Sequence, residues 1–288
     1  MRAHRRWILD AHRGIAVTVP AGIMGILNAT PDSFSDGGKH PNTAAIVRAG
    51  VDMIRDGADW LDVGGESTRP GALPVDADSE LARVIPIVRG LREAGVRAPI
   101  SIDTSKGIVA EAALAAGADV VNDVTAGSDP RLLEACAAAA CPIVLMHMQG
   151  NPQTMQRNPS YADVHAEVAA FLTARIALAI RAGISESAIL LDPGIGFGKD
   201  MTHNVSLLSA LPSLSAQTGR PLVVGISRKS LVTQLIGSPL PAEQRDPPSH
   251  VLHALLAPAC SLLRVHDPAG ARTALRLSSA VRMNEQAA

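Results

Sequence analysis

Acidic, amide and basic side chains follow short apolar runs at intervals along this 288-residue chain. In residues 189–200, ILLDPGIGFGKD, an apolar run ends at Asp192 and is followed at once by proline and glycine. A short apolar run bounded by turn residues is typical of a buried strand. A carboxylate at the mouth of such a strand is costly unless a partner compensates its charge. Asp192 is therefore predicted to serve a binding or catalytic site.

Similar runs place further polar groups at predicted strand ends. They are Asn28, Asp62 with Glu66 beyond it, Asp103, Asn122, His147, Arg228 with Lys229, and Arg264 with His266. Any single Asp or Asn could equally cap the helix that follows, and His147 could equally be a satisfied core histidine. Lys229, Arg264 and His266 are poor caps, so the set as a whole favours function.

The basic members of this set predict an anion site. Arg264 and His266 are two residues apart on one predicted strand, so their side chains point the same way. A guanidinium and an imidazole that converge suit a phosphate or diphosphate, to which Arg69 can add. Asn28 could help to orient a Mg²⁺ ion that arrives with the diphosphate, because Mg²⁺ takes few protein ligands.

The acidic members predict a second pole on the opposite side of the mouth. Asp103, Asp192 and Asn122 offer hydrogen-bond acceptors, and Lys229 offers a donor. An aminopyrimidinone-type ring matches this pattern, with adjacent N–H donors and one carbonyl. We expect a ring at the acidic pole and its leaving group at the basic pole.

The elements that must position these groups alternate regularly between strand and helix. Eight strand-then-helix units predict parallel strands and a closed (β/α)8 TIM barrel, whereas an open doubly wound sheet would gather its polar ends at one switch point. Residues 7–20 predict an N-terminal β-hairpin. We expect residues 1–20 to cap the barrel formed by residues 21–288. One helix is expected from about 202 to 216, and Pro258 should end the helix before the last strand early.

Composition excludes several classes of function. The net charge is -1 and aromatic residues make up 2% of the chain, so neither nucleic acid nor a membrane is an expected partner. The three cysteines form no metal-like pair and predict idle thiols in a reducing compartment. The arginine-rich N-terminus lacks a signal peptide's apolar core and cleavage site, so a cytoplasmic location is expected.

Two short patterns resemble other sites only superficially. Residues 194–199, GIGFGK, lack the glycine spacing and the Ser or Thr of a Walker phosphate loop. His250 and His253 share a helical face but have no evident third ligand for zinc.

Eight longer motifs, in order, resemble those of the dihydropteroate synthase family. They are GILNATPDSFSDGG (25–38), DVGGESTRPGA (62–72), SIDTSK (101–106), VNDV (121–124), LMHMQGNPQTMQ (145–156), LDPGIGFGKD (191–200), GISRKS (225–230) and RVHD (264–267). The resemblance covers residue 22 to the end of the chain. It departs from the family between Arg245 and Leu262, which bears on local packing and on the dimer contact.

The resemblance implies a homodimeric TIM barrel that joins p-aminobenzoate to 6-hydroxymethyl-7,8-dihydropterin diphosphate. Asp103, Asp36 and Lys229 would be catalytic. The pterin would contact Asp103, Asn122, Met146, Asp192, Gly225 and Lys229. The diphosphate, with Mg²⁺ at Asn28, would contact Asn28, Thr68, Arg69, Arg264 and His266. The p-aminobenzoate would contact Phe34, Ser35, Thr68, Pro70, Phe197, Lys229 and Ser230.

Two rival functions would share part of this pattern. A pterin-binding methyltransferase module would keep the acidic wall but would not need Arg264 and His266. A non-catalytic pterin-binding protein would not need the diphosphate pole either. The family also includes sulfonamide-insensitive members whose p-aminobenzoate pocket is altered. The ordinary Phe34 and Pro70 do not decide between a sensitive and an insensitive enzyme, so antibiotic resistance stays open.

Overall fold

The computed structural model describes residues 5–30 and 42–285, and its first element is an antiparallel hairpin. Strand β1 (Arg5–Asp10) pairs with β2 (Ile15–Val19). The Asp10 carboxylate closes the turn by accepting the backbone N–H groups of His12, at 2.9 Å, and Arg13, at 3.0 Å. The predicted N-terminal hairpin is confirmed. The predicted division of the chain at residues 20 and 21 stays a prediction.

Eight parallel strands form the barrel, as predicted. They are β3 (Gly22–Asn28), β4 (Trp60–Gly64), β5 (Ile100–Asp103), β6 (Val120–Asp123), β7 (Ile143–Met146), β8 (Ile189–Asp192), β9 (Val223–Gly225) and β10 (Leu262–Val265). Their order is β8-β7-β6-β5-β4-β3-β10-β9. A single parallel bridge between Leu191 and Leu222 joins the two ends of this sheet and closes the ring.

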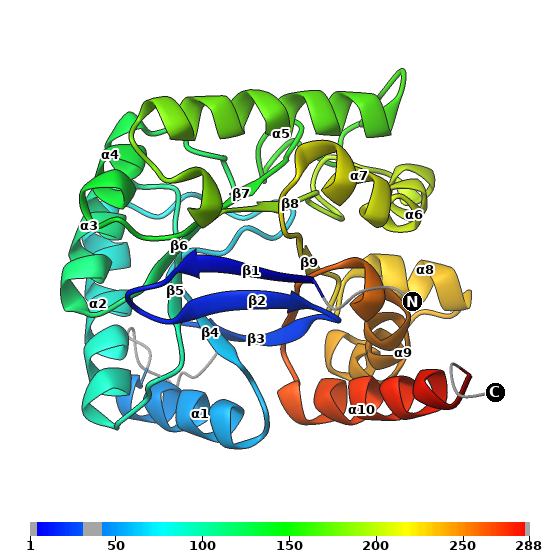
Figure 1. The fold of residues 1–288 in the computed structure, drawn as a ribbon, viewed down its shortest axis with the longest axis horizontal. Helices are drawn as coiled ribbons and strands as arrows, with labels where there is room; N and C mark the ends of the chain where they lie inside the picture. The colour runs from blue at the N-terminus through cyan, green and yellow to red at the C-terminus, as the bar shows by residue number, and fades with distance from the viewer. Residues whose placement is uncertain (1–4, 31–41, 286–288) are drawn as a thin grey trace.

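The helices surround the strands, as Figure 1 shows. They are α1 (Thr43–Arg55), α2 (Ala77–Glu93), α3 (Gly107–Ala116), α4 (Pro130–Ala138), α5 (Val164–Arg181), α6 (Met201–Ser209), α7 (Leu211–Thr218), α8 (Ser230–Ile236), α9 (Asp246–Leu256) and α10 (Pro268–Glu285). Asn42 and Asp76 cap α1 and α2 by accepting the backbone N–H groups of Ala45 and Ser79. None of the described helices has both the length and the apolar character needed to cross a bilayer.

The helix predicted from about 202 to 216 is wrong, because two helices occupy this stretch. Helix α6 ends at Ser209, and α7 restarts at Leu211 with Pro212 in its first turn. Proline lacks an N–H group and fits the first turn of a helix but not its interior, so it marks a new start. Pro258 acts as predicted: α9 ends at Leu256, and a short 3-10 turn (Ala257–Ala259) follows.

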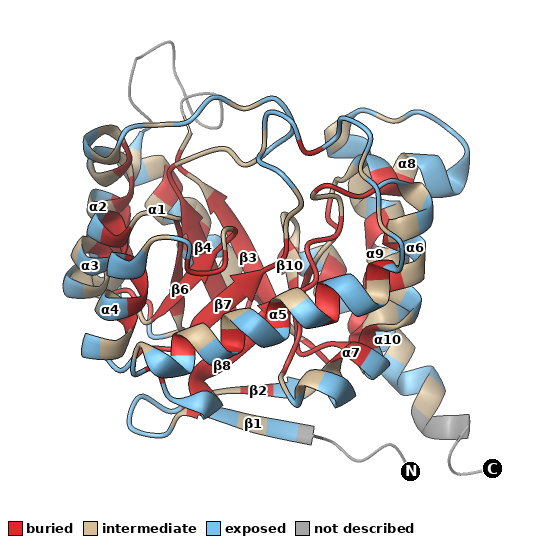
Figure 2. Cartoon of the chain, turned by 90° about the horizontal axis from the view of Figure 1, so that it is seen from above, coloured by how far each residue is buried: buried red, intermediate tan, exposed pale blue. Residues whose placement is uncertain are grey.

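Side chains inside the barrel are arranged in layers. The lowest layer is apolar, and Leu9, Ile15 and Val17 of the hairpin pack against it from below. Its members are Met24, Trp60, Val120, Val144, Leu190, Val223 and Leu262. Figure 2 shows the hairpin beneath these strands. The apolar layer thus closes one end of the barrel, and polar side chains occupy the interior above it.

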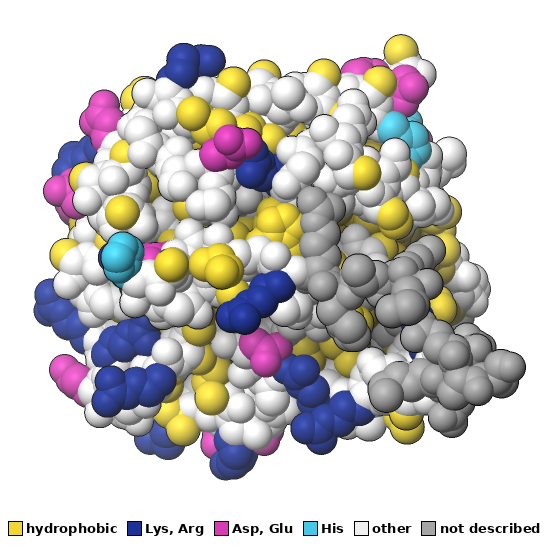
Figure 3. All heavy atoms as spheres, in the orientation of Figure 1, with side chains coloured by type: hydrophobic (Ala, Val, Ile, Leu, Met, Phe, Trp, Pro, Cys, Tyr) yellow, Lys and Arg dark blue, Asp and Glu magenta, His cyan; other side chains and the backbone are white. Residues whose placement is uncertain are grey.

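The hairpin face of the molecule carries side chains of both charges. In Figure 3, most of the Lys and Arg side chains on this face lie in the lower half of the view, with a few Asp and Glu side chains among them.

Candidate active site

Arg264 joins two acidic side chains at the mouth of the barrel. Its Nε donates to Asp62 Oδ2 at 2.5 Å, and its Nη2 donates to Asp103 Oδ2 at 2.6 Å. Asn122 adds a hydrogen bond from Nδ2 to the same Asp62 oxygen at 3.2 Å. The strand register brings these side chains together. Asp103 on β5 pairs with Asn122 on β6 and with Gly64 on β4, and Asp62 lies two residues before Gly64 on the same face of β4. Strands β4, β5, β6 and β10 therefore build one polar cluster.

The polar cluster carries more negative than positive charge. Asp62 is fully buried and Asp103 is 7% exposed, and the two share one guanidinium. Burial raises the pKa of Asp103 to about 7, against the opposing effect of Arg264, and the charge of Asp62 raises it further. Asp62 Oδ1 has no hydrogen-bond partner within the part of the chain that the structure describes. The cluster can therefore accept a donor-rich ligand.

This arrangement differs from the two separate poles that we expected. The predicted cation Arg264 lies among the predicted acids. Its strand, β10, lies between β3 and β9, and its side chain extends to Asp62 on β4 and Asp103 on β5. The sequence predicts Asp62 as a strand-end acid without indicating which ligand it serves. Strand alternation could have placed it in the site, because Asp62 lies two residues before Gly64 and therefore on the same face of β4, and Gly64 is the register partner of Asp103.

Asp192 and Lys229 form the other half of the mouth. Asp192 Oδ1 accepts the backbone N–H of Gly194 at 2.7 Å, and burial raises the pKa of its carboxyl group. Lys229 Nζ donates to the Ile195 carbonyl and lies 4.5 Å from the centroid of the Phe197 ring. Burial lowers the pKa of Lys229 to about 8, while the charge of Asp192 opposes that shift.

Gly225 and Met146, which the family resemblance assigns to the pterin, lie beside these groups. A Cβ atom on Gly225 would lie 3.8 Å from Arg264 Cβ and 3.9 Å from Lys229 Nζ, so this glycine leaves space between the two cations. Met146 is buried and pairs with Asp192 in the strand register. An apolar side chain thus adjoins the polar groups where a flat ring can pack.

His266 is held as a neutral imidazole. Its Nδ1 lies 3.0 Å from Ser227 Oγ. Burial lowers its pKa to about 3, and the nearby charges of Arg228, Arg264 and Arg69 act in the same direction. The predicted cation is therefore uncharged at neutral pH in this structure, although a bound anion would favour its protonation.

Thr68, Arg69 and Pro70 lie on the loop between β4 and α2. Thr68 lines a hollow of about 110 Å³ together with Asp103, and Arg69 and Pro70 are exposed. Lys106 anchors the loop: its Nζ donates to Glu66 and, at 2.6 Å, to the buried Glu80.

The remaining predicted residues are placed as follows. Asn28 ends β3 opposite Gly64, and no hydrogen bond of its side chain is found among the described residues. Ser230 is exposed at the start of α8. Phe34, Ser35 and Asp36 lie outside the described residues.

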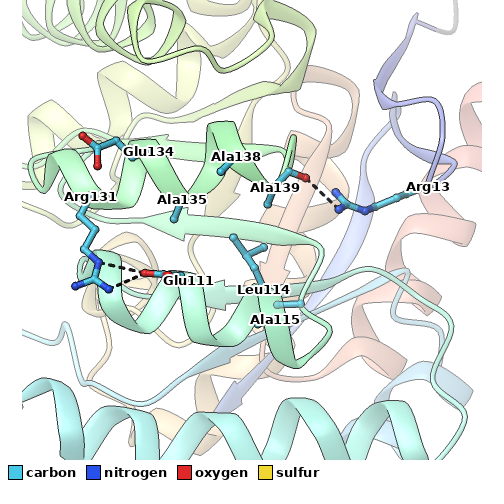
Figure 4. A pocket seen from close by; sticks show the side chains of 10 residues that line it. Arg13, Glu111, Leu114, Ala115, Arg131, Glu134, Ala135, Ala138 and Ala139 are labelled. Atoms are coloured by element: carbon cyan, nitrogen blue, oxygen red, sulfur yellow. Dashed lines mark hydrogen bonds and ion pairs between the residues drawn. The ribbon is translucent and has the colours of Figure 1, made fainter.

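A larger hollow of about 540 Å³ lies on the outside of the barrel between α3 and α4. Figure 4 shows that two of its polar side chains, Arg131 and Glu111, bond each other and that Arg13 bonds the backbone at the C-terminal end of α4. Arg131 Nη2 donates to Glu111 at 2.6 Å, and Arg13 Nη2 donates to the Ala139 carbonyl at 3.1 Å. The rest of its lining is mainly alanine, so this hollow offers little for recognition.

The described part of the chain contains no cluster of His, Cys, Asp and Glu side chains suited to a metal ion. Within residues 5–30 and 42–285, no group of three or more His, Cys, Asp or Glu side chains could hold an ion. His250 bonds Asp267 at 2.9 Å through Nε2. His253 is buried, and neither of its ring nitrogens has a hydrogen-bond partner in the part of the chain that the structure describes.

Comparison with known proteins identifies this arrangement. Residues 24–266 match the family described as pterin binding enzyme. Dihydropteroate synthase of Neisseria meningitidis serogroup B is 46% identical over 267 residues, covering 91% of this chain and 93% of that protein. The structure of Xanthomonas albilineans dihydropteroate synthase with 4-aminobenzoic acid superposes with a TM-score of 0.87 at 45% identity, covering 97% and 99% of the two chains. The same enzyme in complex with 7,8-dihydropteroate gives 0.83 at 43% identity, covering 96% and 99%. The chain belongs to the dihydropteroate synthase family of pterin-binding enzymes.

Proposed function

We propose that this protein is a dihydropteroate synthase, which condenses 6-hydroxymethyl-7,8-dihydropterin diphosphate with p-aminobenzoate and releases diphosphate. The observation that carries the proposal is the buried cluster of Asp62, Asp103, Asn122 and Arg264 beside Asp192 and Lys229. It supplies acceptors for the N–H groups of a pterin and cations for its leaving group. The related structures with 4-aminobenzoic acid and with 7,8-dihydropteroate support this assignment.

The pterin ring lies over the acceptors. Asp103, Asn122 and Asp192 accept its N–H groups, Lys229 donates to its carbonyl, and Met146 and Gly225 adjoin the ring. A site that is built to hydrogen-bond such a ring leaves buried carboxylates unpaired with a poorer ligand, which penalises the wrong substrate. The raised pKa values of Asp103 and Asp192 support this role, since bound N–H donors would favour the ionised forms.

The diphosphate lies toward Arg264, His266, Thr68 and Arg69, with Asn28 nearby. These groups stabilise negative charge on the departing diphosphate as the C–O bond breaks. Asp103 stabilises the positive charge that develops on the pterin methylene, with Asp36 as a second acid. The neutral amine of p-aminobenzoate then forms the new C–N bond and loses a proton. No strong base is needed, because this amine is unprotonated at neutral pH.

The p-aminobenzoate subsite adjoins Phe197 and Lys229. Ser230, Pro70 and Thr68 complete it, together with Phe34 and Ser35. The contact between Lys229 and the Phe197 ring supports this placement, because it brings a cation and an apolar surface together beside the pterin groups.

A Mg²⁺ ion fits this site as a companion of the diphosphate. The Asn28 amide oxygen is a hard ligand at the rim, and Mg²⁺ keeps water and phosphate oxygens for its other positions. Such an ion needs only one or two protein ligands, so it does not require a dedicated group of acidic side chains. Bound there, it would neutralise charge on the leaving group.

A homodimer is the proposed assembly. Helices α9 and α10 expose four large apolar side chains: Val251 and Leu255 on α9, and Leu277 and Val281 on α10, each 62–65% exposed. Ser278 and Arg282 of α10 both donate to the Ala254 carbonyl of α9, so the two exposed pairs lie on adjoining helices. A second copy of the chain would cover this surface. A cytoplasmic location is supported by the three cysteines, which are free and buried.

The proposed function is tested by measuring diphosphate release and pterin product together. We expect release that requires Mg²⁺ and is stimulated by p-aminobenzoate, with one dihydropteroate formed for each diphosphate. A non-catalytic pterin-binding protein would bind the pterin and form no product. A methyltransferase module would bind methyltetrahydrofolate instead. Competition by a sulfonamide against p-aminobenzoate would then decide whether the enzyme is sensitive to the drug.

A further inference from the structure

Lys199 is a buried lysine with no acidic hydrogen-bond partner among residues 5–30 and 42–285. Its side chain is 2% exposed, and its Nζ contacts His147 Nδ1 at 2.8 Å and the carbonyl oxygens of Gly194 and Phe197, each at 3.0 Å. Burial of an ammonium group without a carboxylate is costly, even when neutral acceptors surround it. Burial also lowers the pKa of Lys199 to about 7, with Asp192 opposing the shift and Lys229 adding to it. A methionine would fill this place at less cost, which suggests a use for the charge.

The partner histidine is an acceptor in this arrangement. Burial lowers the pKa of His147 to about 3, and the charge of Lys199 lowers it further. The imidazole is therefore neutral, so Nδ1 can accept from the ammonium. Its ring packs edge-on against Phe171 with the centroids 4.9 Å apart, which fixes its orientation.

Lys199 and Lys229 both bond the backbone of the turn formed by residues 194–197. Lys199 binds the carbonyls at positions 194 and 197, and Lys229 donates to the carbonyl of Ile195 between them. The Phe197 ring, at the end of this turn, lies 4.5 Å from Lys229 Nζ. The two lysines thus bond different carbonyl groups of the same short turn.

Glycines allow the turn to pass close to its surroundings. Gly194 and Gly198 have φ values of 68° and 64°, and a Cβ atom on Gly194 would lie 1.8 Å from the His147 carbonyl oxygen. Such a backbone needs restraint from side chains, since glycine itself restrains it little. Outside the two lysines, Gln156 and Tyr161 bind the carbonyls of Gly196, at 2.6 Å, and Gly198, at 2.7 Å.

We propose that Lys199 is a positioning residue that fixes the turn of residues 194–197, so that the Ile195 carbonyl and the Phe197 ring hold Lys229 in place for the p-aminobenzoate subsite. The inference rests on the proposed function. Two of the pterin acceptors, Asp103 and Asn122, come from other strands and are held by Arg264 and Asp62. The other two pterin contacts, Asp192 and Lys229, do touch this turn, through the Gly194 N–H and the Ile195 carbonyl. Loss of Lys199 should therefore weaken the use of p-aminobenzoate more than the use of the pterin substrate.

The test compares Lys199→Met with wild type in steady-state kinetics for both substrates. For Lys199→Met we expect KM for p-aminobenzoate to rise on the order of tenfold, comparable to the loss of one charged hydrogen bond. KM for the pterin diphosphate should rise less, by about threefold, because Asp103, Asn122 and Arg264 keep their positions. Arg92→Met is the matched control. Arg92 also clamps backbone carbonyls, those of Val96, Ala98 and Gly117, and in addition pairs with Asp119. These groups lie on loops that precede β5 and β6, at the other end of the barrel. Arg92→Met should leave both KM values unchanged.

A milder pair of variants covers the case in which Lys199→Met fails to fold. His147→Asn keeps an oxygen acceptor near the position of Nδ1 and should stay close to wild type. His147→Leu removes the acceptor and should raise KM for p-aminobenzoate selectively, though by less than Lys199→Met.

Equal rises in both KM values, or a loss of stability with neither KM changed, would overturn the positioning role. A wild-type enzyme that forms no dihydropteroate would instead overturn the proposed function. The two failures are therefore distinguished by the wild-type measurement alone.

Discussion

The guanidinium of Arg264 and the carboxylate of Asp103 meet at 2.6 Å although 161 residues separate them in the chain. Arg264 also binds the fully buried Asp62, so one cation serves two acids. In the proposed reaction this cation faces the leaving group while its partner acid faces the ring. Binding of a diphosphate and ionisation of Asp103 would therefore compete for the same positive charge.

Replacing Arg264 with methionine should destabilise the protein in a pH-dependent way. Removal of one partner from a buried ion pair commonly costs about 3–5 kcal/mol, because the remaining charge is uncompensated. Here the loss should be larger at pH 8 than at pH 5.5, where Asp103 can take up a proton. Urea denaturation at the two pH values measures this. Arg264→Lys, which keeps the charge but not the forked geometry, should recover only part of the loss. Equal losses at both pH values would contradict the shared-cation interpretation.

Asp103→Asn should reduce turnover strongly while the protein remains folded. The amide keeps the size of the side chain but cannot stabilise positive charge on the pterin methylene. We expect kcat/KM to fall by about 10²-fold, as for the loss of one preorganised electrostatic group. The assay is product formation, with pterin binding measured in parallel. Near-normal turnover would show that this carboxylate does not have the catalytic role proposed for it.

The same variant should change how stability depends on pH. The pKa of Asp103 is raised from 3.8 to about 7 in the folded protein, so the folded state binds the extra proton between these values. The stabilisation from this group is complete below pH 4 and is lost as the pH rises through 7, at up to about 1.4 kcal/mol per pH unit. Asp103→Asn should remove this contribution. Parallel pH profiles of unfolding free energy for wild type and variant, between pH 4.5 and 7.5, would contradict the raised pKa.

Lys106→Met should loosen the loop that carries Thr68 and Arg69. Lys106 bonds both Glu66 and the buried Glu80, and Glu66 also accepts the backbone N–H of Val75 at 3.0 Å. We expect a loss of about 2 kcal/mol in unfolding free energy, less than for a fully buried pair because Lys106 is partly exposed. KM for the pterin diphosphate should rise as well.

The control for this variant is Arg131→Met, which breaks a largely exposed pair with Glu111. Such pairs contribute little, so stability and KM should both stay near wild type. If Lys106→Met destabilised the protein without any effect on KM, its anchoring of the substrate loop would be disproved.

Which side chains reach the mouth could be predicted from the sequence, because strand alternation and the Gly-rich breaks are local signals. Asp103, Asn122, Asp192 and Lys229 all lie where the strand ends predicted. The partner of Arg264 could not be predicted, since it depends on which strands lie across the barrel and in which register. Lys199 was overlooked for the same reason. It lies in a glycine-rich loop, and no Asp or Glu three or four residues away predicts an ion pair for it. Its burial becomes evident only from its contact with His147 in the folded structure.

The proposed homodimer leads to a prediction about α9 and α10. Leu255→Asp combined with Leu277→Asp places two carboxylates on the exposed apolar surface, where desolvation on association would be costly. We expect the double variant to be monomeric by size-exclusion chromatography with light scattering, at concentrations where wild type is dimeric. Leu73→Asp is the matched control, because Leu73 is 75% exposed in the loop before α2, away from this surface. It should remain dimeric. A wild type that is monomeric at micromolar concentration, or a double variant that stays dimeric, would show that these two helices do not form the contact.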